Sequence, residues 1–274
     1  MSGLEAAALA IVASFVVGRA KLGDARGFLG RLALLVVASF LAEDSSIRLY
    51  GFYFYDARWS LFVDQVPLAI LLIWPVVIHS AWDLARHLLG RGDRRVALVG
   101  TLLVLADASL IEPVAVAAGL WRWTEPGLFT VPPLGILGWS FHAGLCMVAL
   151  ERAAGETSRE ALVLATPLGT HALLLAGWWG VFRRVNGVIP AWPSVGLLWL
   201  VSAALLVVSL RCGARKRVPL GEFLLRVPAA LFFFVLLAIH GRSDPALVAW
   251  TLAFAPPYCS LLDVRLGGLG APRS

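Results

Sequence analysis

Residues 107–139 read DASLIEPVAVAAGLWRWTEPGLFTVPPLGILGW, and the rest of the chain is organised around this stretch. It begins in an apolar helix pattern that carries Asp107 and Glu112 to lipid depth, and it continues through Pro113 into a tryptophan-rich turn. Because proline lacks a backbone donor and disfavours the helical conformation in the residue before it, we expect the helix to break here. Intramembrane carboxylates are costly and by default indicate a functional site. The alternative is a pair of acids that hydrogen-bond neighbouring helices for structure alone.

The composition is that of a polytopic membrane protein. Of the 274 residues, 59% are hydrophobic and 15% are charged, whereas a soluble domain carries about 25% charged residues. Several apolar runs reach the roughly 18 residues that a helix needs to cross a bilayer. Strands are not expected, because the alternating segments of a membrane barrel are missing from the sequence. We therefore predict an all-α transmembrane helical bundle that forms a single integral membrane domain over residues 1–274.

The apolar runs predict about eight to nine spans, and no internal repeat is recognised among them. The runs fall near residues 4–18, 28–43, 61–84, 96–119, 133–150, 160–181, 194–210, 222–240 and 245–262. The net charge is +6, and most of the Lys and Arg residues lie in short runs between the spans. It is therefore interpreted as a topology signal and not as a nucleic-acid surface.

The basic residues are distributed unevenly between the connecting segments. Sixteen of the 23 Lys and Arg lie in segments 19–31, 85–95, 151–159 and 211–217 and in the C-terminal tail. The positive-inside rule then predicts that the N-terminus lies outside and the C-terminus lies in the cytoplasm, in a bacterial inner membrane.

This topology places several aromatic and acidic groups on the outer side of the membrane. They are Glu43, the segment 49–59 (LYGFYFYDARW), Glu112 and the turn Trp121–Trp123. We expect the two aromatic segments to close over one cavity. For segment 49–59 the alternative is an ordinary aromatic belt at the membrane interface.

The predicted catalytic residues are three acids. Asp107 and Glu112 are five residues apart, about 140° around an ideal helix, so they share one cavity only if the helix breaks at Pro113. With Glu43 they are expected to line a reactive pocket in which at least one carboxyl is protonated and acts as a general acid. Aromatic faces stabilise a cation and offer an apolar substrate a binding surface. The residues predicted to supply them are Tyr53, Tyr55, Trp121, Trp123 and Trp139.

No metal or cofactor is predicted. His79, Asp83 and His87 lie on one helix stripe, which leaves open a metal site or a helix-end pair that reaches the interface. The isolated His142, His171 and His240 are interpreted as hydrogen-bonded histidines of the bundle. Arg226 either pairs with an intramembrane acid or reaches the cytoplasmic interface, and its position near a helix end favours the interface.

Residues 40–140 resemble the integral-membrane carotenoid-biosynthesis family that includes the bacterial carotenoid 1,2-hydratases. At two positions the sequence differs from the pattern: Glu112 stands where the family usually has Asp, and Gly135 where it often has Asn. The matching motifs are Glu43, Gly51-Phe52-Tyr53-Phe54-Tyr55, Val66-Pro67-Leu68, Trp74, Asp107, Glu112-Pro113, Gly119-Leu120-Trp121-Arg122-Trp123, Val131-Pro132 and Gly138-Trp139.

The resemblance implies a carotenoid-biosynthesis membrane enzyme, a hydro-lyase that hydrates a terminal C=C of an acyclic carotenoid by acid catalysis. The partners that the resemblance implies are a long apolar isoprenoid substrate, the lipid bilayer and other pigment-pathway membrane enzymes. A nucleic-acid partner is not expected. The residues alone leave a carotenoid cyclase or isomerase open, because those reactions use the same groups. Two further alternatives are a non-catalytic membrane scaffold of a pigment-assembly complex and a proton-coupled transporter or flippase.

Overall fold

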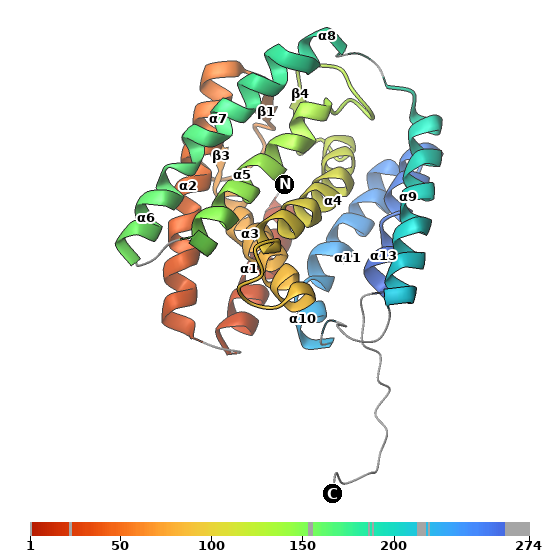
Figure 1. Ribbon diagram of the computed structural model, residues 1–274. Helices are drawn as coiled ribbons and strands as arrows, with labels where there is room; N and C mark the ends of the chain where they lie inside the picture. The colour runs from red at the N-terminus through yellow and green to blue at the C-terminus, as the bar shows by residue number, and fades with distance from the viewer. Residues whose placement is uncertain are drawn as a thin grey trace, which may run out of the picture.

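The computed structural model describes residues 2–21, 24–152, 156–185, 187, 189–212, 218 and 220–260. These residues form a helical bundle, shown in Figure 1, with only short strands. Within this part of the chain, 7 helical segments are long and apolar enough to cross a membrane. The predicted all-α polytopic bundle is therefore confirmed.

The long elements follow one another along the chain with short connections. Five of them are the single helices α1 (Ser2–Lys21), α2 (Ala25–Tyr50), α3 (Leu68–Leu89), α4 (Val96–Ala117) and α5 (Pro133–Arg152). The next crosses as α6 (Glu156–Leu164), α7 (Thr166–Gly177) and the π-helical turn η1 (Trp178–Phe182), and it is followed by the short α8 (Arg183–Val185). The seventh is α9 (Ala191–Cys212).

The last two predicted spans are interrupted. The span predicted at 222–240 consists of α10 (Leu220–Leu224), α11 (Val227–Leu236) and the π-helical turn η2 (Leu237–Gly241). The span predicted at 245–262 consists of α12 (Pro245–Leu252) and α13 (Ala255–Ser260). Each of α11, α12 and α13 has a proline in its first turn. Because proline has no backbone N–H, it cannot donate a hydrogen bond to a carbonyl of a preceding helical turn, and a new helix begins there. In the described residues, seven helical segments of membrane length and two broken segments thus correspond to the apolar runs of the predicted spans.

There are two short antiparallel pairings among the described residues: one joins segments that are distant in the sequence, and the other is a local hairpin. Strand β1 (Tyr53–Tyr55) pairs with β4 (Trp121–Trp123), and β2 (Phe62–Val63) pairs with β3 (Val66–Pro67) just before α3. The sequence predicts no strands, and pairings of two or three residues are too short to leave an alternating pattern. The β1–β4 pairing confirms that the two aromatic segments lie side by side.

Two glycines direct the chain into the paired strands. Gly51 follows α2 with φ +59°, and Gly119 follows α4 with φ +69°. This left-handed conformation at a helix C-terminus is accessible to glycine without strain. Both helices therefore end abruptly, and an aromatic strand begins two residues after each glycine.

The predicted helix break at Pro113 is wrong. Helix α4 is continuous from Val96 to Ala117, with Pro113 buried inside it. A proline at this position removes the hydrogen bond to the carbonyl four residues earlier, which belongs to Ser109. The indole of Trp250 on α12 donates to that carbonyl at 2.8 Å instead. The distant donor satisfies the carbonyl and the helix does not break.

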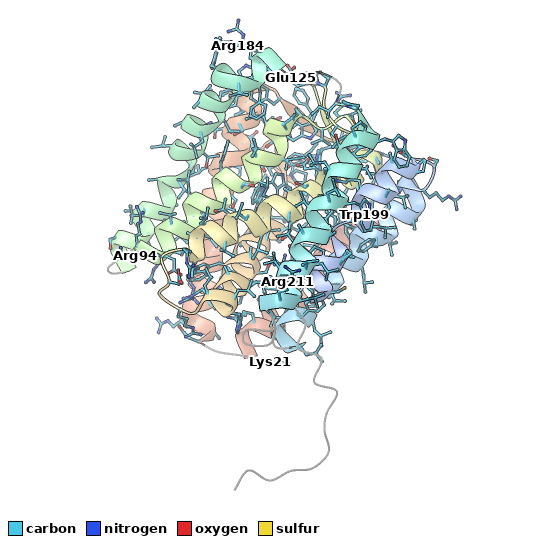
Figure 2. The ribbon with its side chains drawn as sticks, turned by 45° about the vertical axis from the view of Figure 1, so that its right-hand side comes forward. Lys21, Arg94, Glu125, Arg184, Trp199 and Arg211 are labelled. Atoms are coloured by element: carbon cyan, nitrogen blue, oxygen red, sulfur yellow. The ribbon has the colours of Figure 1, made fainter. Side chains whose placement is uncertain are left out.

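The labelled charges lie toward two ends of the bundle. In Figure 2, Lys21, Arg94 and Arg211 lie in the lower half, whereas Glu125 and Arg184 lie at the top. Three of the basic segments that were predicted to share one membrane side therefore reach the same end. Arg215, Lys216 and Arg217 and the basic tail lie outside the described residues.

Candidate functional site

A cavity of about 150 Å³ lies inside the bundle, enclosed mainly by α1 to α5, α7 and α11 and covered by β1 and β4. Its wall consists largely of aliphatic and aromatic side chains. Three carboxylates are among its lining residues: Glu43 and Glu112, which are buried, and Glu125, which lies in the loop that follows β4. Seven of the eight residues predicted for the site line this cavity. They are Glu43, Glu112, Tyr53, Tyr55, Trp121, Trp123 and Trp139.

Three tryptophans hold Glu112, whose residue surface is only 2% exposed. The indole N–H groups of Trp121 and Trp123 donate to its Oε2 at 2.8 Å and 2.9 Å. The indole of Trp139 donates to its Oε1 at 2.6 Å. An indole N–H can donate but cannot accept, so all three contacts require acceptor oxygens on Glu112. We refer to these four residues as the Glu112 cage.

Glu43 is held by one indole and two phenols. Trp74 donates to Glu43 Oε1 at 2.8 Å. Tyr55 donates to Oε2 at 3.1 Å, and Tyr53 donates to the same oxygen. A phenol can donate or accept a hydrogen bond, so this set, the Glu43 cage, tolerates either protonation state of the carboxyl.

The two phenols stay protonated at neutral pH. Burial is the main cause that raises the pKa of Tyr53 and of Tyr55 well above the usual range. Both residues lie on β1, outside the membrane-length helices. They are therefore neutral hydroxyl groups that face a carboxyl group.

Aromatic packing joins the two cages into one wall. The β1–β4 register sets Tyr53 opposite Trp123 and Tyr55 opposite Trp121, with ring centroids 4.8 Å and 5.9 Å apart. Trp74 and Trp139 meet with centroids 4.5 Å apart. Each residue that donates to Glu43 thus contacts one that donates to Glu112.

The close approach of Gly135 to Trp123 leads to a prediction. A Cβ at Gly135 would lie 2.5 Å from Cζ2 of the indole. We expect Gly135→Ala to displace Trp123 from Glu112 and to lower the free energy of unfolding by about 1–3 kcal/mol, as overpacking does. Thermal unfolding of the detergent-purified protein measures this. Gly138→Ala is the control, because its Cβ would meet Leu174 at an ordinary 3.4 Å; equal losses in both variants would contradict the prediction.

Asp107 is placed apart from the cavity. Its Oδ2 accepts from Arg226 at 2.5 Å, and its Oδ1 accepts from Tyr258 at 2.6 Å. Arg226 also donates to Ser80 at 3.0 Å. Because α4 does not break at Pro113, Asp107 and Glu112 stay on different faces of the helix, and Asp107 is not among the residues that line the cavity. The preference for an interfacial Arg226 is also wrong, since Arg226 pairs with this intramembrane acid.

The histidines make hydrogen bonds within the bundle. His142 contacts Ser39 at 3.1 Å and Thr170 at 3.3 Å, and His171 contacts Ser45 at 2.7 Å and Tyr50 at 2.9 Å, which confirms the interpretation for these two residues. His240 is exposed, so the interpretation is not confirmed for the third histidine. His79 contacts Asp83 at 2.8 Å, whereas His87 is exposed. In the described part of the chain, no group of three or more His, Cys, Asp and Glu side chains is arranged to hold a metal ion.

Trp74 and His142 line the cavity although the sequence did not assign them to the site. Trp74 was recognised only as a matching motif. Its role depends on contact with Glu43, 31 residues away on another helix. His142 lies one turn after Trp139 on α5, and this position is the sequence signal that could have assigned it to the site.

Comparison with known proteins adds the identity of the family. The sequence model described as "Carotenoid biosynthesis protein" matches residues 3–201. No curated protein and no solved structure matches the chain. The family match spans well over half of the sequence, and it contains both carboxylate cages. The chain therefore belongs to the carotenoid biosynthesis protein family.

Proposed function

We propose that the protein is an enzyme that adds water to a terminal C=C of an acyclic carotenoid by acid catalysis. The observation that carries this proposal is the presence of two buried carboxyl groups, Glu43 and Glu112, in one apolar cavity walled by aromatic rings. A lipid-soluble polyene requires an apolar binding site, and hydration of an isolated alkene requires a strong, positioned acid. Membership in the family supports a role in carotenoid biosynthesis.

The proposed reaction uses the two carboxyl groups and one water molecule. A protonated carboxyl transfers its proton to the less substituted carbon of the double bond, and the π electrons form the new C–H bond. The tertiary carbocation that results is stabilised by the neighbouring aromatic faces and by the second, ionised carboxylate. Water then attacks the cationic carbon, and its released proton returns to the first carboxyl. The net change is the addition of one water.

The proposal assigns substrate contacts to the aromatic wall and leaves Asp107 out of the chemistry. Tyr53, Tyr55, Trp121, Trp123 and Trp139 all line the cavity that is also lined by the two carboxyl groups. Both oxygens of Asp107 are engaged by Arg226 and Tyr258. An ionised carboxylate paired with a guanidinium is a poor proton donor.

Expression in a lycopene-producing bacterium tests the proposed reaction. The pigments should gain the mass of one water for each hydrated end, as measured by mass spectrometry. An unchanged mass with an altered absorption spectrum would replace hydration by cyclisation or isomerisation. Unchanged pigments, with the protein folded in the membrane, would favour the scaffold or transporter.

We also propose that the N-terminus lies outside and the C-terminus lies in the cytoplasm of a bacterial inner membrane, on the basis of the distribution of basic residues. A cytoplasmic reporter fused after Ser274 should be active. The same reporter inserted beside Arg184, at the opposite end of the bundle in Figure 2, should be silent. Reversed activities would overturn the orientation.

A further inference from the structure

The two carboxylate cages are built in the same way. Helix α2 carries Glu43, ends at Gly51 and leads into β1, whose two tyrosines donate back to Glu43. Helix α4 carries Glu112, ends at Gly119 and leads into β4, whose two tryptophans donate back to Glu112. In each case the third donor is a tryptophan on the next long helix, Trp74 on α3 or Trp139 on α5.

The sequence spacing follows the same scheme. Both strands lie in a Gly-x-aromatic-x-aromatic motif, beginning at Gly51 and at Gly119. A Val-Pro pair then precedes the next helix, and Trp74 follows Val66 by eight residues just as Trp139 follows Val131. The acids end the similar stretches ASFLAE (38–43) and ASLIE (108–112). No repeat was recognised in the sequence because the loops between glycine and valine differ in length and the aromatic residues differ in type.

The arrangement in space agrees with a repeated unit. An antiparallel strand pair has local two-fold symmetry, and the β1–β4 register is centred on the pair Phe54 and Arg122. Helix α2 packs against α3, and α4 packs against α5. The two units therefore meet through their strands, with one carboxylate from each facing the shared cavity.

We propose that residues 38–74 and 108–139 are two copies of one half-site, and that the phenols of the first copy make Glu43 the proton-carrying acid whereas the indoles of the second keep Glu112 ionised. The duplication does not depend on the reaction. The assignment of one carboxyl as the acid and of the other as the anion adds detail to the proposed function and rests on it.

The assignment follows from what each donor can do. Hydrogen bonds donated to a carboxylate favour its charged form, and Glu112 receives three from groups that have no acceptor atom. A protonated Glu112 would have to turn its O–H away from all three indoles. The phenols of Tyr53 and Tyr55 can instead accept the proton of a neutral Glu43 in a hydrogen bond. One carboxyl is therefore suited to hold a proton and the other to remain an anion.

Internal repeats also occur in transporters, where the substrate site is built from discontinuous helices. The two helices that carry the acids here, α2 and α4, are continuous. The repeat therefore does not by itself favour the transport alternative.

Infrared spectroscopy of the detergent-purified protein in H₂O and D₂O tests the assignment directly. A protonated carboxyl has a C=O stretch distinct from that of a carboxylate, and deuteration shifts it. We expect this band in the native protein, its loss in Glu43→Gln and its retention in Glu112→Gln. Loss in Glu112→Gln with retention in Glu43→Gln, or no band in the native protein, would refute the assignment.

The equivalent tryptophans provide a second measurement that does not require an acid to be replaced. Trp74→Phe removes one donor from Glu43, and Trp139→Phe removes one from Glu112. A hydrogen bond to a charged group contributes more than one to a neutral group. We therefore expect the larger fall in the unfolding midpoint for Trp139→Phe, although Trp74 is the more deeply buried residue. The opposite order would count against an ionised Glu112.

Neither measurement depends on turnover. A protein that has the Glu43 band but makes no hydrated pigment would refute the proposed hydration and leave the two half-sites standing. A protein that hydrates lycopene but loses the band only in Glu112→Gln would keep the function and reverse the roles of the acids.

Discussion

Replacing Glu43 with glutamine should lower the rate of hydration by about 10²–10⁴-fold, the contribution of a positioned general acid. The fold should persist, because the amide can satisfy the Glu43 cage. Its oxygen can accept from Trp74, and its NH₂ group can donate to the phenol oxygens of Tyr53 and Tyr55. The measurement is the ratio of hydrated to unmodified pigment per mole of folded protein.

Glu112→Gln is the matched comparison and should behave differently. Trp139 donates to one oxygen of Glu112, whereas Trp121 and Trp123 donate to the other. An amide offers only one acceptor atom, so at least one indole would face an NH₂ group, and an unsatisfied buried donor costs about 1–3 kcal/mol. Glu112→Gln should therefore lower both stability and turnover. Full activity in both amide variants would remove the pair from the mechanism.

The second large effect is expected at the ion pair between Asp107 and Arg226. Replacing Arg226 with methionine leaves a largely buried carboxylate without its counter-ion, a change that costs about 3–5 kcal/mol when one partner of a buried pair is removed. The guanidinium and the carboxylate expose only 17% and 16% of their side-chain surfaces. The measurement is the free energy of unfolding in detergent, and the expected loss is large enough to reduce the yield of folded protein.

Two companion variants separate structure from catalysis at this pair. The double variant Arg226→Met with Asp107→Leu should recover most of the stability, because apolar replacements of both partners remove the unpaired charge. Asp107→Asn should retain turnover per mole of folded protein, since Asp107 does not line the cavity. A large fall in turnover for Asp107→Asn would return this acid to the mechanism.

The sequence was sufficient to predict the membrane bundle and the two buried carboxyl groups with five of the aromatic residues around them, because both follow from local patterns. Apolar runs of span length fix the long helices, and the aromatic motifs beside the glycines mark the segments that became β1 and β4. The positive-inside rule placed these segments on one side of the membrane, which agrees with their pairing.

The predictions that failed depended on partners far away in the chain. Pro113 does not break α4, because the free carbonyl of Ser109 is satisfied by Trp250, 141 residues further on. Asp107 forms an ion pair with Arg226, 119 residues away. Local helix geometry contains no information about either contact. The role of Trp74 also depends on a contact between helices, because its indole reaches Glu43 only when α2 and α3 pack together.

For the proposed carotenoid substrate, the size of the cavity limits the length of chain that can be bound at one time. An apolar cavity of roughly 150 Å³ takes up a molecule the size of benzene, and the cavity that both acids line has a volume of about 150 Å³. Only one end of a long polyene can therefore occupy it, and the remainder must lie outside it. For a substrate with two reactive ends, the proposed hydration would then be distributive: the singly hydrated pigment would leave the enzyme, accumulate early and compete with fresh substrate before the second end is modified.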